Sequence, residues 1–482
     1  MPITDVHPEV SAVAEDWQTL RDVIEGQRAV KGNPRYRSNI IQLSNAQEDE
    51  QRVIAHAKRY LPDFVPPNAA RYQRVLNLAR FLNITGHTVK KLTGAAFNKE
   101  PEVELLPSIE FMEDNADGAN GDLIGLAKSC VLNTTGIGRH ILLVDFPRVE
   151  EQNVSQERQQ QLRLQAKICE YIAEAGINWD DDNGILKLLV LTEYIRDTTQ
   201  DRFSHNVTLH RRIYWLDENR QCRVAVVRDG ESINEEEAET VLDFNGTPLD
   251  YIPAVIIGAD KNGPPVDKSP VLDMAYSNIT HYQVDAAHRE NLQVHGQLTL
   301  GISSDADMQQ LKDANGGEFA VGAPNGILLG PGGAFHTATA PESAALPAAL
   351  EALKEDMVAI GATLVDRNNR NMTARQAGIE ATEQTSIMQN VVGNVSDGIE
   401  LALYYAARFM EASPNQEAIR YRISTEFFDD VVDAQTLTAA LMYIDRGILS
   451  REKAAELLDK ALPIELDEND LSAADEDVVV NS

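Results

Sequence analysis

The sequence predicts a helix-rich α+β protein, and three observations lead to that class. Apolar residues recur every three or four positions over long stretches at both ends of the chain, which is typical of amphipathic helices. Residues 185–258 instead contain short apolar runs separated by turn-forming residues, which is typical of strands in an antiparallel or mixed sheet. With 482 residues, of which 43% are hydrophobic, the chain is long enough for several domains with buried cores.

The first half of the chain alternates between the two patterns. Residues 10–24 and 68–91 are predicted helices, and residues 122–132 form another before a turn at Gly136–Gly138. The apolar run 141–146 is a predicted strand, whereas residues 150–175 have a helical composition. Further strands are expected at residues 185–195, 207–216, 222–227 and 252–257, with a hairpin turn between the second and third of these.

The second half is dominated by long helices. Ser269 and Pro270 are favourable first residues for a helix that runs to Gly296, and a second helix is predicted over 346–365. The intervening residues 301–341 hold eight glycines and three prolines, so we expect a loop-rich segment with short strands. Thr373 and Gln376 form a predicted capping box for a long bent helix to about residue 410. A strand at 419–428, helices at 437–446 and 451–462, and an acidic tail complete the predicted chain.

Charge restricts the possible partners. The chain has 43 basic and 75 acidic residues, a formal net charge of −32. Tight binding to DNA over a broad surface depends on Lys and Arg that release counterions from phosphate, so this mode of binding is disfavoured. The charge is compatible with a nucleic acid that passes the protein without adhering to it. No stretch approaches the ~18 consecutive apolar residues of a membrane helix, and we expect no membrane association.

Catalytic and metal-binding motifs are missing from the sequence. It lacks GxxxxGK[ST], HExxH and GxSxG, and Gly136-Ile137-Gly138 precedes a predicted strand rather than a helix. The acidic turn 180–184 lacks the spacing of a calcium loop. The cysteines, Cys130, Cys169 and Cys222, lie far apart and are interpreted as buried small residues. We therefore expect no catalytic residue, no metal and no cofactor, and a protein that is not an enzyme.

Two polar patterns are candidate functional features. His281, His288 and His295 lie seven residues apart and share one face of the predicted helix; adjacent members are about 10 Å apart, too far to share a metal within one chain. A polar face packed on a neighbouring helix is the simpler interpretation, and a ring of such stripes in an oligomer is the alternative. The polar break 366–372 contains residues that commonly contact phosphate and sugar oxygens. They are Arg367, Asn368, Asn369, Arg370 and Asn371, and an ordinary exposed loop is the alternative.

The order of these parts resembles the portal proteins of tailed bacteriophages, in the branch with a large N-terminal region. Individual segments carry the resemblance, above all residues 269–298 (SPVLDMAYSNITHYQVDAAHRENLQVHGQL). The others are 72–82 (YQRVLNLARFL), 94–101 (GAAFNKEP), 138–147 (GRHILLVDFP) and 252–258 (IPAVIIG). The resemblance covers about residues 60–450.

The resemblance implies a portal-like fold and a division of the chain. The wing would comprise 1–268, with a mixed sheet, together with a long kinked helix at 373–412. The stem would be a pair of helices, 269–297 and 343–365, flanking a loop-rich clip at 298–342. Residues 366–372 would be the tunnel loop facing DNA, and residues 413–482 a helical crown with its acidic tail.

The resemblance also implies a function. Such proteins form a homo-oligomeric ring, usually a dodecamer, at one capsid vertex of the virion, assembled in the host cytoplasm. The ring would conduct double-stranded DNA without sequence specificity during packaging and ejection. Its expected partners are the terminase large subunit, the head-tail adaptor, and the major capsid and scaffold proteins.

Two alternatives stay open at this point. One is another phage head structural protein, such as a scaffold or minor capsid protein. The other is a cytosolic enzyme with an unrecognised site, whose acids would come from the turn at 180–182.

Overall fold

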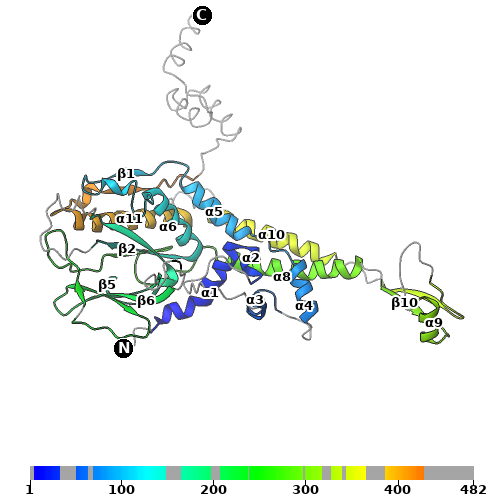
Figure 1. Cartoon of the computed structure of the whole chain (residues 1–482). Coiled ribbons are helices and arrows are strands. Elements are labelled where there is room, and N and C mark those ends of the chain that lie inside the picture. Colours follow the sequence, from blue (N-terminus) through cyan, green and yellow to red (C-terminus); the bar gives the residue numbers. More distant parts are fainter. Residues whose placement is uncertain are drawn as a thin grey trace, which may run out of the picture.

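A computed structural model describes residues 5–32, 50–62, 69–147, 164–196, 203, 207–236, 238–296, 299–316, 327–338, 344–364 and 386–427. The α+β class is confirmed. Figure 1 shows a body of sheets and helices, from which two long helices project side by side toward a small lobe at their far end. We call α8 (Leu272–Gly296) and α10 (Ala345–Thr363) the arm, and the described residues within 299–338 the distal lobe.

The N-terminal part of the body is helical, and the helix predicted over 10–24 is confirmed. The helix predicted over 68–91 is wrong, because the chain forms two helices with a break at residues 79–83. The Asn83 side chain caps the second helix by accepting from the Gly86 N–H. Helices in this part are α1 (Pro8–Glu25), α2 (Gln27–Val30), α3 (Glu50–Ala57), α4 (Ala69–Leu78), α5 (Ile84–Ala96), η1 (Glu110–Met112) and α6 (Leu123–Ile137).

Three sheets of described strands form the β part of the body, in the orders β3-β2-β9, β4-β5-β6-β7-β8 and β1-β12. An antiparallel or mixed sheet was predicted, and every pairing between the described strands is antiparallel. The strands are β1 (Glu102–Glu104), β2 (Arg139–Asp145), β3 (Lys167–Ile172), β4 (Gly176–Asp182), β5 (Ile185–Arg196), β6 (Val207–Leu216), β7 (Cys222–Arg228), β8 (Glu239–Thr240), β9 (Ala254–Gly258) and β12 (Arg420–Arg422), with η2 (Ala173–Ala175) between β3 and β4.

The strands predicted from apolar runs and turn residues are confirmed at β2, β5, β6, β7 and β9. The helix predicted over 150–175 is wrong in its described part, where β3 pairs with β2 from Asp145↔Lys167 to His140↔Ile172. Pairing with an otherwise open edge of β2 satisfies a row of backbone groups, and this outweighs the helical composition of the segment.

The last described helix, α11 (Ile387–Met410), packs on the β3–β2–β9 sheet. Ser386 has an extended backbone and forms a capping box with Gln389, so the unbroken helix predicted from Thr373 is interrupted here. Gly398 lets the helix approach β9 closely, because a Cβ at this position would lie 2.7 Å from Ile257 Cγ1. After η3 (Gln416–Ala418), β12 pairs with β1 and is shorter than the strand predicted over 419–428. The predicted helices at 437–446 and 451–462 and the acidic tail lie outside the described residues.

Candidate functional site

The arm is the most distinctive feature of the structure, and α8 is fixed to the body by a buried amide. The Asn278 side chain is fully buried. Its Oδ1 accepts the N–H groups of Ile84 and Thr85, each at 3.2 Å, and its Nδ2 donates to Leu82 O at 2.7 Å. These contacts satisfy backbone groups at the break between α4 and α5. The first half of α8 therefore packs against this break.

Further polar side chains extend this attachment along α8. Asp285 accepts the Arg80 N–H at 2.7 Å, and it also accepts from Arg289 one turn further on. Gln283 donates to Tyr60 O at 2.9 Å, and Arg71 pairs with Glu290 at 2.6 Å. Since α8 has 25 residues, it is about 37 Å long. Its body-facing side is thus held by hydrogen bonds and ion pairs over most of its length.

The second arm helix, α10, runs antiparallel to α8. Near its end, a Cβ at Gly361 would lie 3.3 Å from Met274 Cε near the start of α8. His281 lies further along α8 and is 4% exposed; neither ring nitrogen has a hydrogen-bond partner among the described residues. Burial lowers the pKa of His281, with smaller effects from Asp285, Lys354 and Glu351. The imidazole is therefore held neutral beside charged groups of both helices.

The outer side of α10 is exposed and apolar. Met357 is its only fully buried residue within the helix, whereas Val358 is 66% exposed. Alanines continue this exposed side at spacings of three, four or seven residues, with the exposed Glu355 between Ala352 and Ala359. They are Ala345, Ala348, Ala352, Ala359 and Ala362. No described segment of this chain covers that side.

Acidic residues dominate the arm and the chain between its helices. Residues 269–364 contain eleven acidic and three basic residues, a net charge of −8. The two bases on the arm helices are paired, Arg289 with Asp285 at 2.7 Å and Lys354 with Glu351 at 3.1 Å. The described arm helices thus carry no unpaired cation that could bind a phosphate.

The distal lobe is a small two-stranded antiparallel sheet with one short helix between its strands. Strands β10 (Thr299–Ser303) and β11 (Ala334–Ala338) pair antiparallel, and α9 (Met308–Ala314) begins at the cap residue Asp307. Ser304 Oγ donates to Leu329 O at 2.6 Å, which ties two loops together. Only Leu311 in α9 is buried. The loop-rich character predicted for 301–341 is therefore found in its described part.

The predicted site residues do not come together within the described structure. His281 is buried in the seam of the arm, His288 is half-buried, and His295 lies in the last turn of α8. Arg367, Asn368, Asn369, Arg370 and Asn371 lie outside the described residues. The described residues on either side of them do meet, because the Met388 N–H donates to Leu364 O at 3.1 Å.

Sequence reasoning missed Asn278, and it also missed a cluster of Cys130, His140 and Glu170 in the body. A buried polar residue on an apolar helix face was the only available signal for Asn278. Nothing in the sequence signals the cluster, whose members are 10 and 30 residues apart.

The structure gives no support to a catalytic role for the acidic turn 180–182. Asp181 accepts the Gly184 N–H within the β4–β5 turn, and Asp182 pairs with Lys187 at 3.2 Å. A cavity of about 240 Å³ lies beside this turn. The stacked rings of Tyr251 and Tyr405 form part of its wall, and no acid, base or histidine lines it. The turn is therefore a structural hairpin within the described part of the body.

Comparison with protein families gives one match. Residues 270–410 match a family described as "Domain of unknown function (DUF4055)". This segment includes the arm, the distal lobe and α11. No curated protein matches the chain.

Among the solved structures that match the chain are three from gene transfer agent (GTA) particles. A chain from the virion of a native particle is 11% identical over 82% of this chain and 94% of its own length, with a TM-score of 0.36. A chain from the neck of an empty particle is 12% identical over 77% and 88%, with a TM-score of 0.36. A third, from the neck of a native particle, is 11% identical over 78% and 89%, with a TM-score of 0.35. At these values the likeness carries no argument about function.

In the described part of the chain, no helix combines the length and the apolar character needed to cross a bilayer.

Proposed function

We propose that this chain is a phage portal protein, a subunit of a ring that conducts double-stranded DNA through one capsid vertex. One observation carries the proposal: two antiparallel helices join a large α+β body to a separate loop-rich lobe (Figure 1). This is the arrangement of wing, stem and clip that the sequence resemblance implies. In the proposal, the body is the wing, the arm is the stem and the distal lobe is the clip.

The charge of the arm supports a conduit rather than a DNA-binding surface. A duplex is retained where cations replace its condensed counterions. The bases of the arm helices are already paired with acids, and twelve copies of a chain with net charge −32 carry roughly −380. A ring of such chains repels the duplex at long range and offers it few places to adhere.

The proposed tunnel loop has a suitable position in the chain. The hydrogen bond between Met388 and Leu364 joins the two described ends that flank residues 365–385. The segment containing Arg367 and Arg370 therefore leaves and re-enters the described structure at the junction of α10 and α11. In the proposal it faces the channel, where two arginines and three asparagines contact passing DNA briefly.

Partners follow from the positions of the parts. The distal lobe would meet the terminase large subunit during packaging and the head-tail adaptor afterwards. The body, which includes β12 paired with β1, would face the major capsid and scaffold proteins, and the chain after residue 427 would extend into the capsid as the crown. We further propose that the chain itself catalyses nothing, and that ATP hydrolysis belongs to the separate motor.

Particle mass tests the proposal most directly. Mass photometry of the purified full chain should show closed rings near twelve times 53.2 kDa, about 640 kDa, with a central channel in negative-stain images. A chain that stays a single copy at assembly concentrations contradicts the proposal. Filaments or shells instead of rings would favour another phage head structural protein.

The loop is tested separately with an Arg367→Ala/Arg370→Ala double variant. We expect rings of unchanged mass that package DNA more slowly or retain it less well. The control is Arg420→Ala, which removes an exposed arginine from the body where it pairs with Glu102. Normal packaging and retention in the double variant would exclude a role for the loop while leaving the ring intact.

A further inference from the structure

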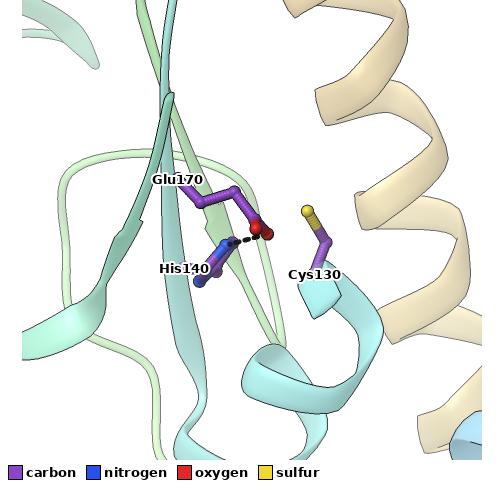
Figure 2. A group of neighbouring side chains, drawn as sticks. All are labelled: Cys130, His140 and Glu170. Atoms are coloured by element: carbon purple, nitrogen blue, oxygen red, sulfur yellow. Dashed lines mark hydrogen bonds and ion pairs between the residues drawn. The ribbon is translucent and has the colours of Figure 1, made fainter. Parts of the chain in front are cut away.

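Three potential metal ligands meet inside the body. Cys130 lies on α6, His140 on β2 and Glu170 on β3, and one ligand atom from each lies within 4.8 Å of the other two. Figure 2 shows the sulfur, the imidazole and the carboxylate pointing toward one another. His140 Nε2 and Glu170 Oε1 are 3.1 Å apart.

The backbone explains why these side chains meet. In the β2–β3 pair, Leu142 lies opposite Glu170 and His140 opposite Ile172, so His140 and Glu170 are diagonal neighbours on one face of the sheet. Gly138 ends α6 in the left-handed conformation, with φ of 95°. The chain therefore turns directly from α6 into β2, and α6 lies back along that face and presents Cys130.

The donor set suits a borderline-soft divalent cation. Thiolate, imidazole and carboxylate are the protein ligands of Zn²⁺, and three of them leave a fourth tetrahedral position for water. Bonds of about 2.1 Å place two tetrahedral ligands about 3.4 Å apart, close to the distance between the His140 and Glu170 atoms. The Cys130 sulfur lies within 4.8 Å of both of these atoms.

The surroundings favour a bound cation over three unrelated side chains. Cys130 is fully buried and His140 is 1% exposed, whereas Glu170 reaches the surface and provides a route from solvent. His140 Nδ1 has no partner among the described residues, so the described polar contact of this ring is the one inside the cluster. A dication would displace the thiol proton to solvent and balance the two resulting negative charges.

We propose that Cys130, His140 and Glu170 form a zinc site that clamps α6 to the β3–β2–β9 sheet. Such a site replaces the expectation of a metal-free chain, and it does not depend on the proposed function. In a ring it would hold the wing rigid where α6 and α11 cover the sheet, and the metal content per chain would be the same in a ring and in a single copy.

The test uses the full chain, stripped with chelator and titrated with Zn²⁺ or Co²⁺ alone. We expect one Zn²⁺ per chain by elemental analysis, a cobalt–thiolate absorption band in the near ultraviolet, and a melting temperature that rises with added zinc. Cys130→Ser should abolish the cobalt–thiolate band, and Glu170→Gln, at the surface, should lower zinc affinity at least tenfold. Cys222→Ser is the matched control, because this buried cysteine lies in β7 outside the cluster.

Two results would overturn the proposal. One is a stripped wild-type chain that binds no more Zn²⁺ than the Cys130→Ser chain. The other is a cobalt–thiolate band that survives Cys130→Ser and disappears with Cys222→Ser. Circular dichroism of each variant excludes loss of fold as the cause, and Glu170→Gln provides the readout if the buried substitution fails to fold.

Discussion

The two arm helices differ in how they are held. The α8 helix buries polar side chains, among them Asn278 and Asp285, whose partners are backbone groups of the body. The α10 helix buries Met357 against α8 and leaves an apolar side exposed, including Val358. The α8 helix is thus held by the body along much of its length, whereas α10 contacts the body at α5, near its own end.

Because of this difference, substitutions in α8 and in α10 should have separate effects, on folding of the single chain and on assembly of the ring. Removing a contact of α8 should weaken the single chain, because a buried polar group loses its partner. Changing the exposed side of α10 should leave the single chain almost unaffected, since surface substitutions usually change stability by less than about 0.5 kcal/mol. If a second copy covers that side, the same change should prevent the ring from closing.

The largest effect is expected for Val358→Asp. A charge placed in an apolar contact between copies costs several times the thermal energy at each of the interfaces in a ring. We expect the fraction of chains in rings to fall more than tenfold in mass photometry, with the melting temperature of the single chain almost unchanged. Val226→Asp, at a 45% exposed valine in β7 of the body, is the control. Equal loss of rings in both variants would contradict the prediction that copies contact each other through the exposed side of α10.

The next effect is expected for Asn278→Ala. It leaves the N–H groups of Ile84 and Thr85 buried without a partner, at a cost of roughly 3 kcal/mol. Chemical denaturation should show this loss in the single chain. The same substitution at Asn291, whose side chain makes no hydrogen bond to any described residue, should cost under about 0.5 kcal/mol. Similar losses at both positions would show that α8 is not held by this amide.

Whether a residue's partners lie nearby or far away in the chain explains which parts of the fold could be predicted from the sequence. The α8 helix and the β6–β7 hairpin were predicted because their signals are local: Ser269-Pro270 and Gly296 bound one, and a four-residue turn joins the other. The strands β2, β5 and β9 and the helix α10 were predictable for the same reason. Local signals give no information about partners that lie far away in the chain.

The errors arise from such distant partners. The break between α4 and α5 is stabilised by Asn278 and Asp285, about 200 residues further along the chain, and the helical pattern of 68–91 carries no trace of them. The β3 strand forms because β2 has an edge to pair. The Cys130, His140 and Glu170 cluster requires both this pairing and the turn at Gly138, so no spacing rule could have found it.

The smallest effect concerns His281 in the seam between the two arm helices. Burial lowers its pKa in the folded chain, opposed by Asp285 on α8 and Glu351 on α10 and assisted by Lys354. A lowered folded pKa means that the unfolded chain binds the proton more readily, so stability is full above the unfolded pKa of about 6.5 and declines as the pH falls toward the folded value. Melting temperatures between pH 7.5 and 5.5 should therefore fall less steeply in His281→Leu than in the wild type. His288→Leu, one heptad along and half-buried, should keep the wild-type slope. An unchanged slope in His281→Leu would mean that the acid sensitivity of the arm comes from its carboxylates, and that the seam between α8 and α10 tolerates a charged imidazole.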